Sequence, residues 1–237
     1  MIPSRLESTR LPNKAIRLIN GMPMIVRVAN AAKNLKLGKV LVASGNKKIS
    51  TILDKFNIES VSTKNTHKSG TDRIFEAFEK KKYKNIKLII NIQGDLPYFS
   101  RELITKLIFL MRDKTVEVGT AVTELKKNEI NDPNIVKACA NLNKFGIGKA
   151  TDFKRNIDSL RNYYHHIGVY AFKPESLGIF VKLSSTKLEK KRKLEQMRAL
   201  ENNMNLKVIK VLEKPLSVDN IKDLKKARNF FKRMKSK

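Results

Sequence analysis

The middle of the chain contains the stretch Leu88-Ile89-Ile90-Asn91-Ile92-Gln93-Gly94-Asp95-Leu96-Pro97. Its first half is a short and almost continuous apolar run, which is typical of a strand buried inside a parallel sheet. Its second half contains Gly94 and Pro97, and these residue types favour a turn. Polar Gln93 and Asp95 therefore follow directly on a buried strand, where α/β sheets bind their ligands.

The segments on both sides repeat this alternation of strand and helix. Apolar residues recur at helical spacing in residues 24–35 and 69–81, and an apolar run at 40–43 separates them. Further helices are expected over 49–56, 100–111, 185–202 and 220–234, and further strands over 118–123, 135–140, 166–172 and 206–212. The pattern predicts an α/β fold with a mostly parallel central sheet and helices on both faces. Because no Gly/Ser-rich linker interrupts the chain, we expect a single domain over residues 1–237.

The chain is strongly basic, with 50 Lys and Arg against 22 Asp and Glu and a formal net charge of +28. Such a balance favours anionic partners. The lysines are nevertheless scattered along the whole sequence, and no RNA-binding aromatic motif, zinc finger or repeat accompanies them. We interpret most of this charge as solvated surface and expect no nucleic-acid partner.

Several features bear on the compartment of the protein. The sequence has no apolar run of eighteen residues, so we expect no stable membrane insertion. It turns polar at Ser4 and lacks the apolar stretch of a secretory signal. Cys139 is the only cysteine, which excludes an intrachain disulfide and a thiolate metal cluster. These observations favour a cytoplasmic location.

The opening stretch, residues 2–14, reads as a shaped loop because Pro3 and Pro12 fix the backbone and remove donors. Two arginines, one lysine and three hydroxyl side chains lie in it. Charge combined with several hydrogen-bond donors suits a polyphosphate. The alternative from the residues alone is a frayed basic terminus.

Other candidate residues each have a structural alternative. Asp95 could hold Mg²⁺ together with substrate phosphates, or it could organise its turn. Asp219 precedes a predicted helix and would make a natural N-cap. His165 and His166 point to opposite faces of a predicted strand, so they do not chelate one ion together. The sequence contains no Gly-x-Ser-x-Gly elbow, no P-loop and no Gly-x-Gly-x-x-Gly motif.

Several blocks, taken in order, resemble the 3-deoxy-manno-octulosonate (Kdo) cytidylyltransferases, the CMP-Kdo synthetases of lipopolysaccharide assembly. The first is Ile-Pro-Ser-Arg-x-x-Ser-Thr-Arg-Leu-Pro-x-Lys at residues 2–14. The others lie at residues 21–25, 67–73, 91–97, 133–137, 166–170, 194–198 and 218–219. Because the blocks span nearly the whole chain, the resemblance is far more specific than any single motif.

The resemblance implies a Rossmann-like nucleotide-diphospho-sugar transferase fold with a small strand-rich dimerisation extension, and a homodimer. It implies the reaction of CTP with Kdo, a 3-deoxy sugar acid, to give CMP-Kdo and pyrophosphate. Arg10, Lys14 and Asp95 would be catalytic, and the nucleotide would be bound by Arg5, Arg10, Lys14, Ser69 and Gly70. Asp95 and Asp219 would hold Mg²⁺. The sugar-acid pocket would be lined by Gln93, Thr120, Ala121, His166, Tyr170, Glu195 and Gln196.

The chain also departs from the family pattern. Gly45 stands where an Asp is usual, and Leu96 replaces an acidic residue after Gly94-Asp95. Apolar residues that normally precede Ile2-Pro3 are missing, so we expect a shortened first strand. Two alternatives stay open. One is a related enzyme for another sugar acid, such as 8-amino-Kdo, or for another nucleoside triphosphate. The other is a non-catalytic anion-binding protein.

Overall fold

The computed structural model describes residues 1–235, and their contacts form two compact units. The first unit contains Met1–Lys84, Asn91–Phe99 and the segment from Pro215 onward. The second unit contains Asn85–Ile90 and Ser100–Lys214. Each unit is therefore built from segments that are far apart in the sequence.

The first unit contains a parallel sheet of three short strands in the order β1-β4-β5. These strands are β1 (Ile2–Ser4), β4 (Val42–Ser44) and β5 (Ser60–Ser62). All three residues of β1 are buried and pair with β4, from Ile2 opposite Val42 to Ser4 opposite Ser44. Short as it is, β1 forms a full register with its neighbour, and the residues after it enter the opening loop.

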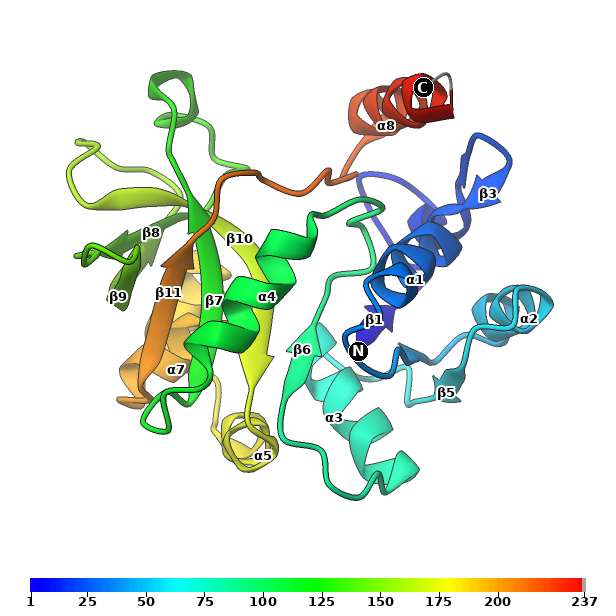
Figure 1. The fold of residues 1–237 in the computed structure, drawn as a ribbon, viewed down its shortest axis with the longest axis horizontal. Coiled ribbons are helices and arrows are strands. Elements are labelled where there is room, and N and C mark those ends of the chain that lie inside the picture. Colours follow the sequence, from blue (N-terminus) through cyan, green and yellow to red (C-terminus); the bar gives the residue numbers. More distant parts are fainter. Residues whose placement is uncertain (236–237) are drawn as a thin grey trace. The chain divides into compact units, whose positions relative to one another are not determined.

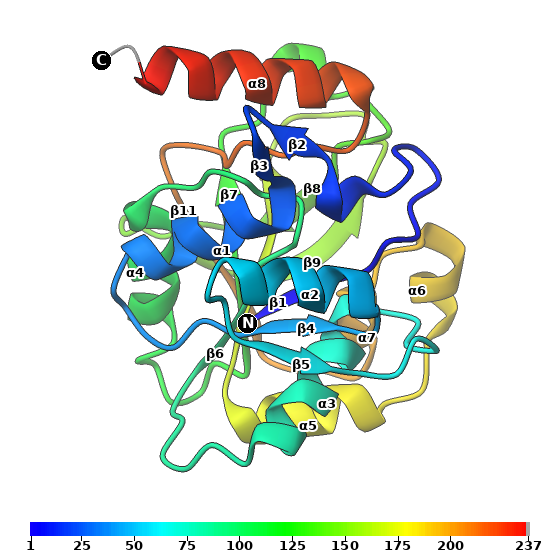
Figure 2. The same ribbon diagram turned by 90° about the vertical axis from the view of Figure 1, so that its right-hand side faces the viewer.

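Four α-helices belong to the first unit: α1 (Met24–Asn34), α2 (Lys47–Lys55), α3 (Gly70–Lys81) and α8 (Ile221–Lys235). Helices α2 and α3 lie on opposite faces of the three-stranded sheet (Figures 1 and 2). Each buries a narrow apolar stripe, which is Ile49 and Leu53 in α2 and Ile74 and Ala77 in α3. Both stripes are typical of amphipathic helices. Of the face predicted for α3, Ile74 is fully buried, whereas Phe75 and Phe78 are half-buried.

Smaller elements lie between β1 and α1. The short helix η1 (Lys14–Ile16) is followed by the hairpin of β2 (Leu18–Ile19) and β3 (Met22–Pro23). Asn20 and Gly21 connect the two strands with positive φ angles of 48° and 78°. Both values fit the two-residue hairpin turn that an Asn-Gly pair predicts.

The second unit contains a mixed sheet in the order β6-β10-β7-β11-β9-β8. Its strands are β6 (Ile89–Asn91), β7 (Val118–Thr123), β8 (Lys137–Ala140), β9 (Ile147–Lys154), β10 (Tyr163–Phe172) and β11 (Leu206–Lys210). Strand β11 runs parallel to β7, whereas β10 is antiparallel to both β7 and β8. Because β8 also pairs with β9, and β9 with β11, five strands form a closed circuit of pairings.

Helix α4 (Arg101–Leu110) lies along this sheet (Figure 1) and buries Leu103, Ile104, Leu107 and Leu110. The remaining helices are η2 (Lys127–Glu129), α5 (Pro174–Lys182), α6 (Lys187–Arg192) and α7 (Met197–Glu201). None of the helices in residues 1–235 is both long and apolar enough to span a bilayer.

The α/β class is confirmed, but three predictions about elements were wrong or incomplete. The single helix expected over 185–202 is broken at Lys193, whose φ of 54° is left-handed. Strands β5 and β9 and helix α5 were not predicted. In α8, Leu224 and Ala227 are fully buried as expected, whereas Ile221, which was expected to face inward, is half exposed.

Candidate active site

A lysine held between two carboxylates forms the centre of the candidate site in the first unit. The Lys14 ammonium donates to Asp95 Oδ2 at 2.6 Å and to Asp219 Oδ1 at 3.1 Å. Arg10 Nη2 donates to the same Asp219 oxygen at 3.0 Å. The structure therefore brings together four of the residues that sequence reasoning assigned to catalysis, nucleotide and metal.

Backbone pairing brings the two carboxylates next to each other although 124 positions separate them in the sequence. The Val218 amide donates to the Asp95 carbonyl at 3.0 Å, and the Leu216 amide donates to the Tyr98 carbonyl at 2.9 Å. These backbone hydrogen bonds hold the segment before α8 against the segment after β6. The N-cap role considered for Asp219 falls to Asn220, whose side chain accepts from the amides of Lys222 and Asp223.

Local backbone geometry directs the charged side chains. Asn13 has a left-handed φ of 57°, a conformation that Asn tolerates better than most residues, and it turns the chain into η1. Ala15 is buried on one side of η1, and Lys14 points to the carboxylates. A side chain at Gly94 would place its Cβ 2.7 Å from the Pro3 carbonyl oxygen. Gly94 is therefore required for β1 to lie against the turn that carries Asp95.

Electrostatics keep Lys14 charged. Burial by itself lowers the pKa of Lys14, but the charges and hydrogen bonds of Asp95 and Asp219 outweigh burial and raise that pKa above its ordinary value. A lysine with a raised pKa is a permanent cation at neutral pH. It suits the stabilisation of phosphate charge, and it does not suit proton abstraction.

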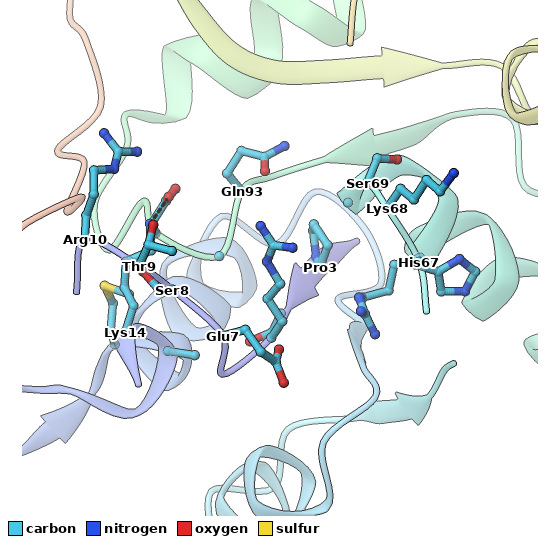
Figure 3. A pocket seen from close by; sticks show the side chains of 18 residues that line it. Pro3, Glu7, Ser8, Thr9, Arg10, Lys14, His67, Lys68, Ser69 and Gln93 are labelled. Carbon is cyan, nitrogen blue, oxygen red and sulfur yellow. Dashed lines mark hydrogen bonds and ion pairs between the residues drawn. The ribbon is translucent and has the colours of Figure 1, made fainter. Parts of the chain in front are cut away.

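A cavity of about 560 Å³ lies beside this cluster. Arg10 and Lys14 stand at one side of it, His67, Lys68 and Ser69 at the other (Figure 3). The lining includes every residue that was predicted to bind nucleotide: Arg5, Arg10, Lys14, Ser69 and Gly70. Gln93, which was predicted for the sugar-acid pocket, also lines it. The opening residues form a wall of this cavity and not a frayed terminus.

Ser4 is a cavity residue that sequence reasoning did not assign. It is 6% exposed, and its hydroxyl has no hydrogen-bond partner within residues 1–235. Buried polar groups are nearly always satisfied, so the Ser4 hydroxyl is a candidate for a contact with a water molecule or a ligand. Its position immediately before Arg5 in the opening block was the available signal.

The carboxylate pair also fits a divalent metal ion. Asp95 and Asp219 already share one cation, the Lys14 ammonium, so their oxygens converge on a common position. No group of three or more His, Cys, Asp or Glu residues suited to a metal ion occurs in the described part of the chain. Mg²⁺ commonly takes one or two carboxylates and completes its shell with phosphates and water, so two ligands suffice.

A second cluster, in the second unit, is buried and uncharged. The Thr120 hydroxyl lies 3.0 Å from His166 Nε2 and within 3.1 Å of the Ile167 and Val169 carbonyl oxygens. It can donate to one carbonyl while accepting from the imidazole. Burial lowers the pKa of His166 to about 3, so its ring is neutral at physiological pH. The ring centroid of His166 lies 5.0 Å from that of Phe153 and 5.6 Å from that of Tyr170.

The remaining predicted sugar-acid residues lie around this cluster in different ways. Burial and the nearby charge of Glu195 raise the pKa of Tyr170, which places Glu195 within electrostatic reach of the phenol. Gln196 is buried at the start of α7. Ala121 is also buried, but as the strand neighbour of Thr120 it directs its side chain to the opposite face. Phe153 was missed because β9, the strand that carries it, was not predicted.

Comparison with known proteins places the chain in one family. The family described as Cytidylyltransferase matches residues 1–209. A 3-deoxy-manno-octulosonate cytidylyltransferase of Bartonella henselae (strain ATCC 49882 / DSM 28221 / CCUG 30454 / Houston 1) is 38% identical over 97% of this chain and 96% of its own. The protein of the same name from Brucella canis (strain ATCC 23365 / NCTC 10854 / RM-666) is 37% identical over 97% of this chain and 94% of its own.

Solved structures agree with these matches. A CMP:2-keto-3-deoxy-manno-octonic acid synthetase complexed with CTP superposes with a TM-score of 0.88 at 29% identity, covering 98% of this chain and 97% of that one. A UDP-glucose pyrophosphorylase complexed with UDP-glucose, at 14% identity, has a TM-score of 0.71 over 98% of this chain and 97% of its own, and shares the fold. The chain therefore belongs to the cytidylyltransferase family, and within it to the 3-deoxy-manno-octulosonate cytidylyltransferases.

Proposed function

We propose that the protein transfers the cytidylyl group of CTP to Kdo, giving CMP-Kdo and pyrophosphate. The observation that carries the proposal is the arrangement of Arg10 and Lys14 against Asp95 and Asp219 beside a polar cavity. Cations and paired carboxylates at one cavity wall suit a metal-bound triphosphate. The names of the relatives supply the sugar acid.

The proposed reaction is an in-line displacement. The anomeric hydroxyl oxygen of the sugar acid bonds to the α-phosphorus and gives up its proton to solvent, and the bond from that phosphorus to the oxygen bridging to the β-phosphate breaks. Negative charge grows on the departing pyrophosphate, and the Arg5, Arg10 and Lys14 cations at the cavity would offset it. Ser69 and Gly70, at the N-terminus of α3, would hold the nucleotide.

Asp95 and Asp219 would hold Mg²⁺, which supplies positive charge to the phosphate oxygens when bound. Both carboxylates are engaged by Lys14 in this structure. Lys14 contacts one oxygen of each, Asp95 Oδ2 and Asp219 Oδ1, so the second oxygen of each carboxylate would be available to the metal while Lys14 offsets phosphate charge. The protein contributes no nucleophile of its own, which is consistent with a reaction that depends on positioning and charge.

The sugar acid would be recognised by buried hydrogen-bonding groups of the second unit. Thr120, His166, Tyr170, Glu195 and Gln196 are proposed for this role. A buried neutral imidazole and a phenol donate and accept without attracting the phosphates. Ala121 would contribute through its backbone.

We extend the proposal to the setting of the enzyme. It would act in the cytoplasm as a homodimer and supply activated Kdo for lipopolysaccharide biosynthesis. Sedimentation equilibrium of the purified chain would test the dimer, because a mass near 27 kDa at micromolar concentration would refute it.

Pyrophosphate release is the test of the function. Purified protein is mixed with Mg²⁺, Kdo and each nucleoside triphosphate in turn, and Kdo is then replaced by 8-amino-Kdo. Release with CTP that depends on Kdo supports the proposal. Turnover only with 8-amino-Kdo or another triphosphate supports the related enzyme suggested by Gly45 and Leu96, and no turnover with any pair supports an anion-binding protein.

A further inference from the structure

Helix α3 holds the segment before it, residues 62–67, through three side chains that lie on one helical face. Arg73 donates to the Thr63 hydroxyl at 2.8 Å and to the Lys64 carbonyl at 3.1 Å. Lys80, two turns further along, donates to the Ser62 carbonyl at 2.9 Å. We call residues 62–67 the α3-bound segment.

Glu76 lies between these two cations and binds the α3-bound segment most directly. One oxygen, Oε2, accepts from the Lys64 amide at 2.9 Å and contacts His67 Nε2. The other, Oε1, pairs with Lys80 at 2.7 Å. Burial raises the pKa of Glu76, but the hydrogen bonds from Lys80, His67 and the Lys64 amide outweigh it and lower that pKa to about 2. The carboxylate is ionised at neutral pH, so its hydrogen bonds are the strong, charge-assisted kind.

The α3-bound segment is also enclosed from its other side. A Cβ added at Gly45, just after β4, would lie 2.0 Å from Asn65 Oδ1 and 2.8 Å from the Thr63 carbonyl oxygen. Gly45 therefore lets the segment pack directly on the backbone that follows β4. Packing therefore explains why Gly45 stands where the family usually has Asp, because the Asn65 side chain fills the space that a side chain at residue 45 would occupy.

The residues that continue this segment form the wall of the cavity opposite to Arg10 and Lys14. His67, Lys68, Ser69 and Gly70 line the cavity, and Figure 3 shows the first three across from those two cations. In the proposed function Ser69 and Gly70 hold the nucleotide, so residues 67–70 form the wall that the nucleoside end of CTP would face when its triphosphate lies at Arg10 and Lys14. Glu76 is not among the lining residues.

We propose that Glu76 is a positioning residue for nucleotide binding, which acts by fixing His67 and the Lys64 backbone so that residues 67–70 form a preorganised wall. The inference rests on the proposed function, since the nucleotide it concerns is CTP. Preorganisation of this kind raises affinity because the loop entropy is lost on folding and not on binding. A structural role alone would lower stability without a selective effect on CTP.

The test compares Glu76→Gln with Glu79→Gln by calorimetric titration of CTP in the presence of Mg²⁺. Both variants remove one negative charge from α3 and keep the side-chain volume, but Glu79 is exposed. We expect Kd for CTP to rise roughly tenfold in Glu76→Gln, the loss of about one charge-assisted hydrogen bond, and to stay within twofold in Glu79→Gln. Equal affinities of wild type and Glu76→Gln overturn the proposal.

Steady-state kinetics separates positioning from a general structural defect. We expect Glu76→Gln to raise KM for CTP with kcat and KM for Kdo changed less than threefold. A parallel fall of kcat with unchanged KM for CTP overturns the positioning role. His67→Ala should raise KM for CTP similarly, and the double variant should be no worse than either single one, because both remove the same anchor.

Hydrogen exchange followed by mass spectrometry gives a readout that needs no nucleotide. Peptides covering residues 62–70 should exchange at least tenfold faster in Glu76→Gln than in wild type, while β4 stays protected. An unchanged rate of hydrogen exchange in residues 62–70 would overturn the proposal that Glu76 anchors this segment. Loss of CTP binding in the wild type itself would instead refute the proposed function, so the two failures are distinguishable.

Discussion

The two units of this protein contain clusters of opposite character, and these would suit different parts of the proposed reaction. The cluster of the first unit is charged and partly open, with the Lys14 side chain 19% exposed and that of Arg10 56% exposed. The cluster of the second unit is closed and neutral, with Thr120 fully buried and His166 nearly so. A triphosphate carries its charge with it and needs cations that water can reach. A sugar acid presents many hydroxyls, and these are distinguished by buried groups that cannot find other partners.

Asp95→Asn gives the largest effect that this contrast predicts. The substitution removes the charge of a proposed metal ligand without changing its volume, so turnover should fall on the order of 10³-fold or more. Pyrophosphate release measures it, and Mn²⁺ binding by electron paramagnetic resonance should weaken in parallel. Asp54→Asn, an exposed change on α2, is the matched control. Near-normal turnover of Asp95→Asn would remove Asp95 from the metal site.

Lys14→Ala should reduce kcat on the order of 10²-fold, because a cation aimed at developing phosphate charge is lost. Exposed Lys48→Ala serves as the control for loss of one positive charge. Lys14→Ala should also bind Mn²⁺ more tightly in the absence of CTP, because the Lys14 ammonium no longer pairs with the Asp95 and Asp219 carboxylates. A raised KM for CTP with unchanged kcat would reduce Lys14 to ground-state binding.

Low pH should affect the two units in different ranges. The pKa of His166 is lowered to about 3, so its neutral form stabilises the fold above the unfolded value of 6.5, and this stability is lost as pH falls toward 3. The pKa of Glu76 is lowered to about 2, so its contribution is present above 4.5 and is lost only as pH falls below that value. Urea unfolding between pH 7.5 and 5 should show a free energy that falls by at most about 1.4 kcal/mol per pH unit from this histidine.

The His166→Gln variant checks which unit causes the free energy of unfolding to fall as the pH is lowered. His166→Gln should reduce the change in the free energy of unfolding between pH 6.5 and 5. Glu76→Gln should leave that change as it is in the wild type. An unaltered slope in His166→Gln would show that the buried neutral imidazole does not control acid stability.

Ser4→Ala gives the smallest expected effect, and it tests whether a buried hydroxyl near the charged cluster of the first unit contacts the nucleotide. Its hydroxyl is buried and unsatisfied within the described residues, yet it belongs to the charged unit. If it bonds the nucleotide, Kd for CTP should rise about 2- to 10-fold, the range of one neutral hydrogen bond. Exposed Ser185→Ala, away from the cavity, is the control for loss of a hydroxyl. An unchanged or tighter Kd would exclude the contact.

Most of the first unit was predictable because local rules and tertiary structure agree there. Ser69 caps α3 through the Asp72 amide, and Asn20-Gly21 forms its hairpin turn. In the second unit, local sequence preferences and tertiary packing disagree more often. The charged run from Lys187 to Lys193 favours one long helix, but burial of Leu194 and a left-handed Lys193 divide it into α6 and α7. Packing overrode propensity at that position.

Sequence by itself determined the α/β class, the family blocks and the candidate residues Arg10, Lys14, Asp95, Asp219 and His166. The α/β class followed from strand and helix periodicity and from turn residues, which are local properties of the chain, whereas the candidate residues followed from the resemblance of the ordered blocks to the family. Only the tertiary structure decided that Lys14 lies between Asp95 and Asp219, since this depends on the backbone bond from Val218 to Asp95. It also decided the surroundings of Ser4, Gly45 and Glu76, because burial, close approach and shared partners arise only when distant segments pack together.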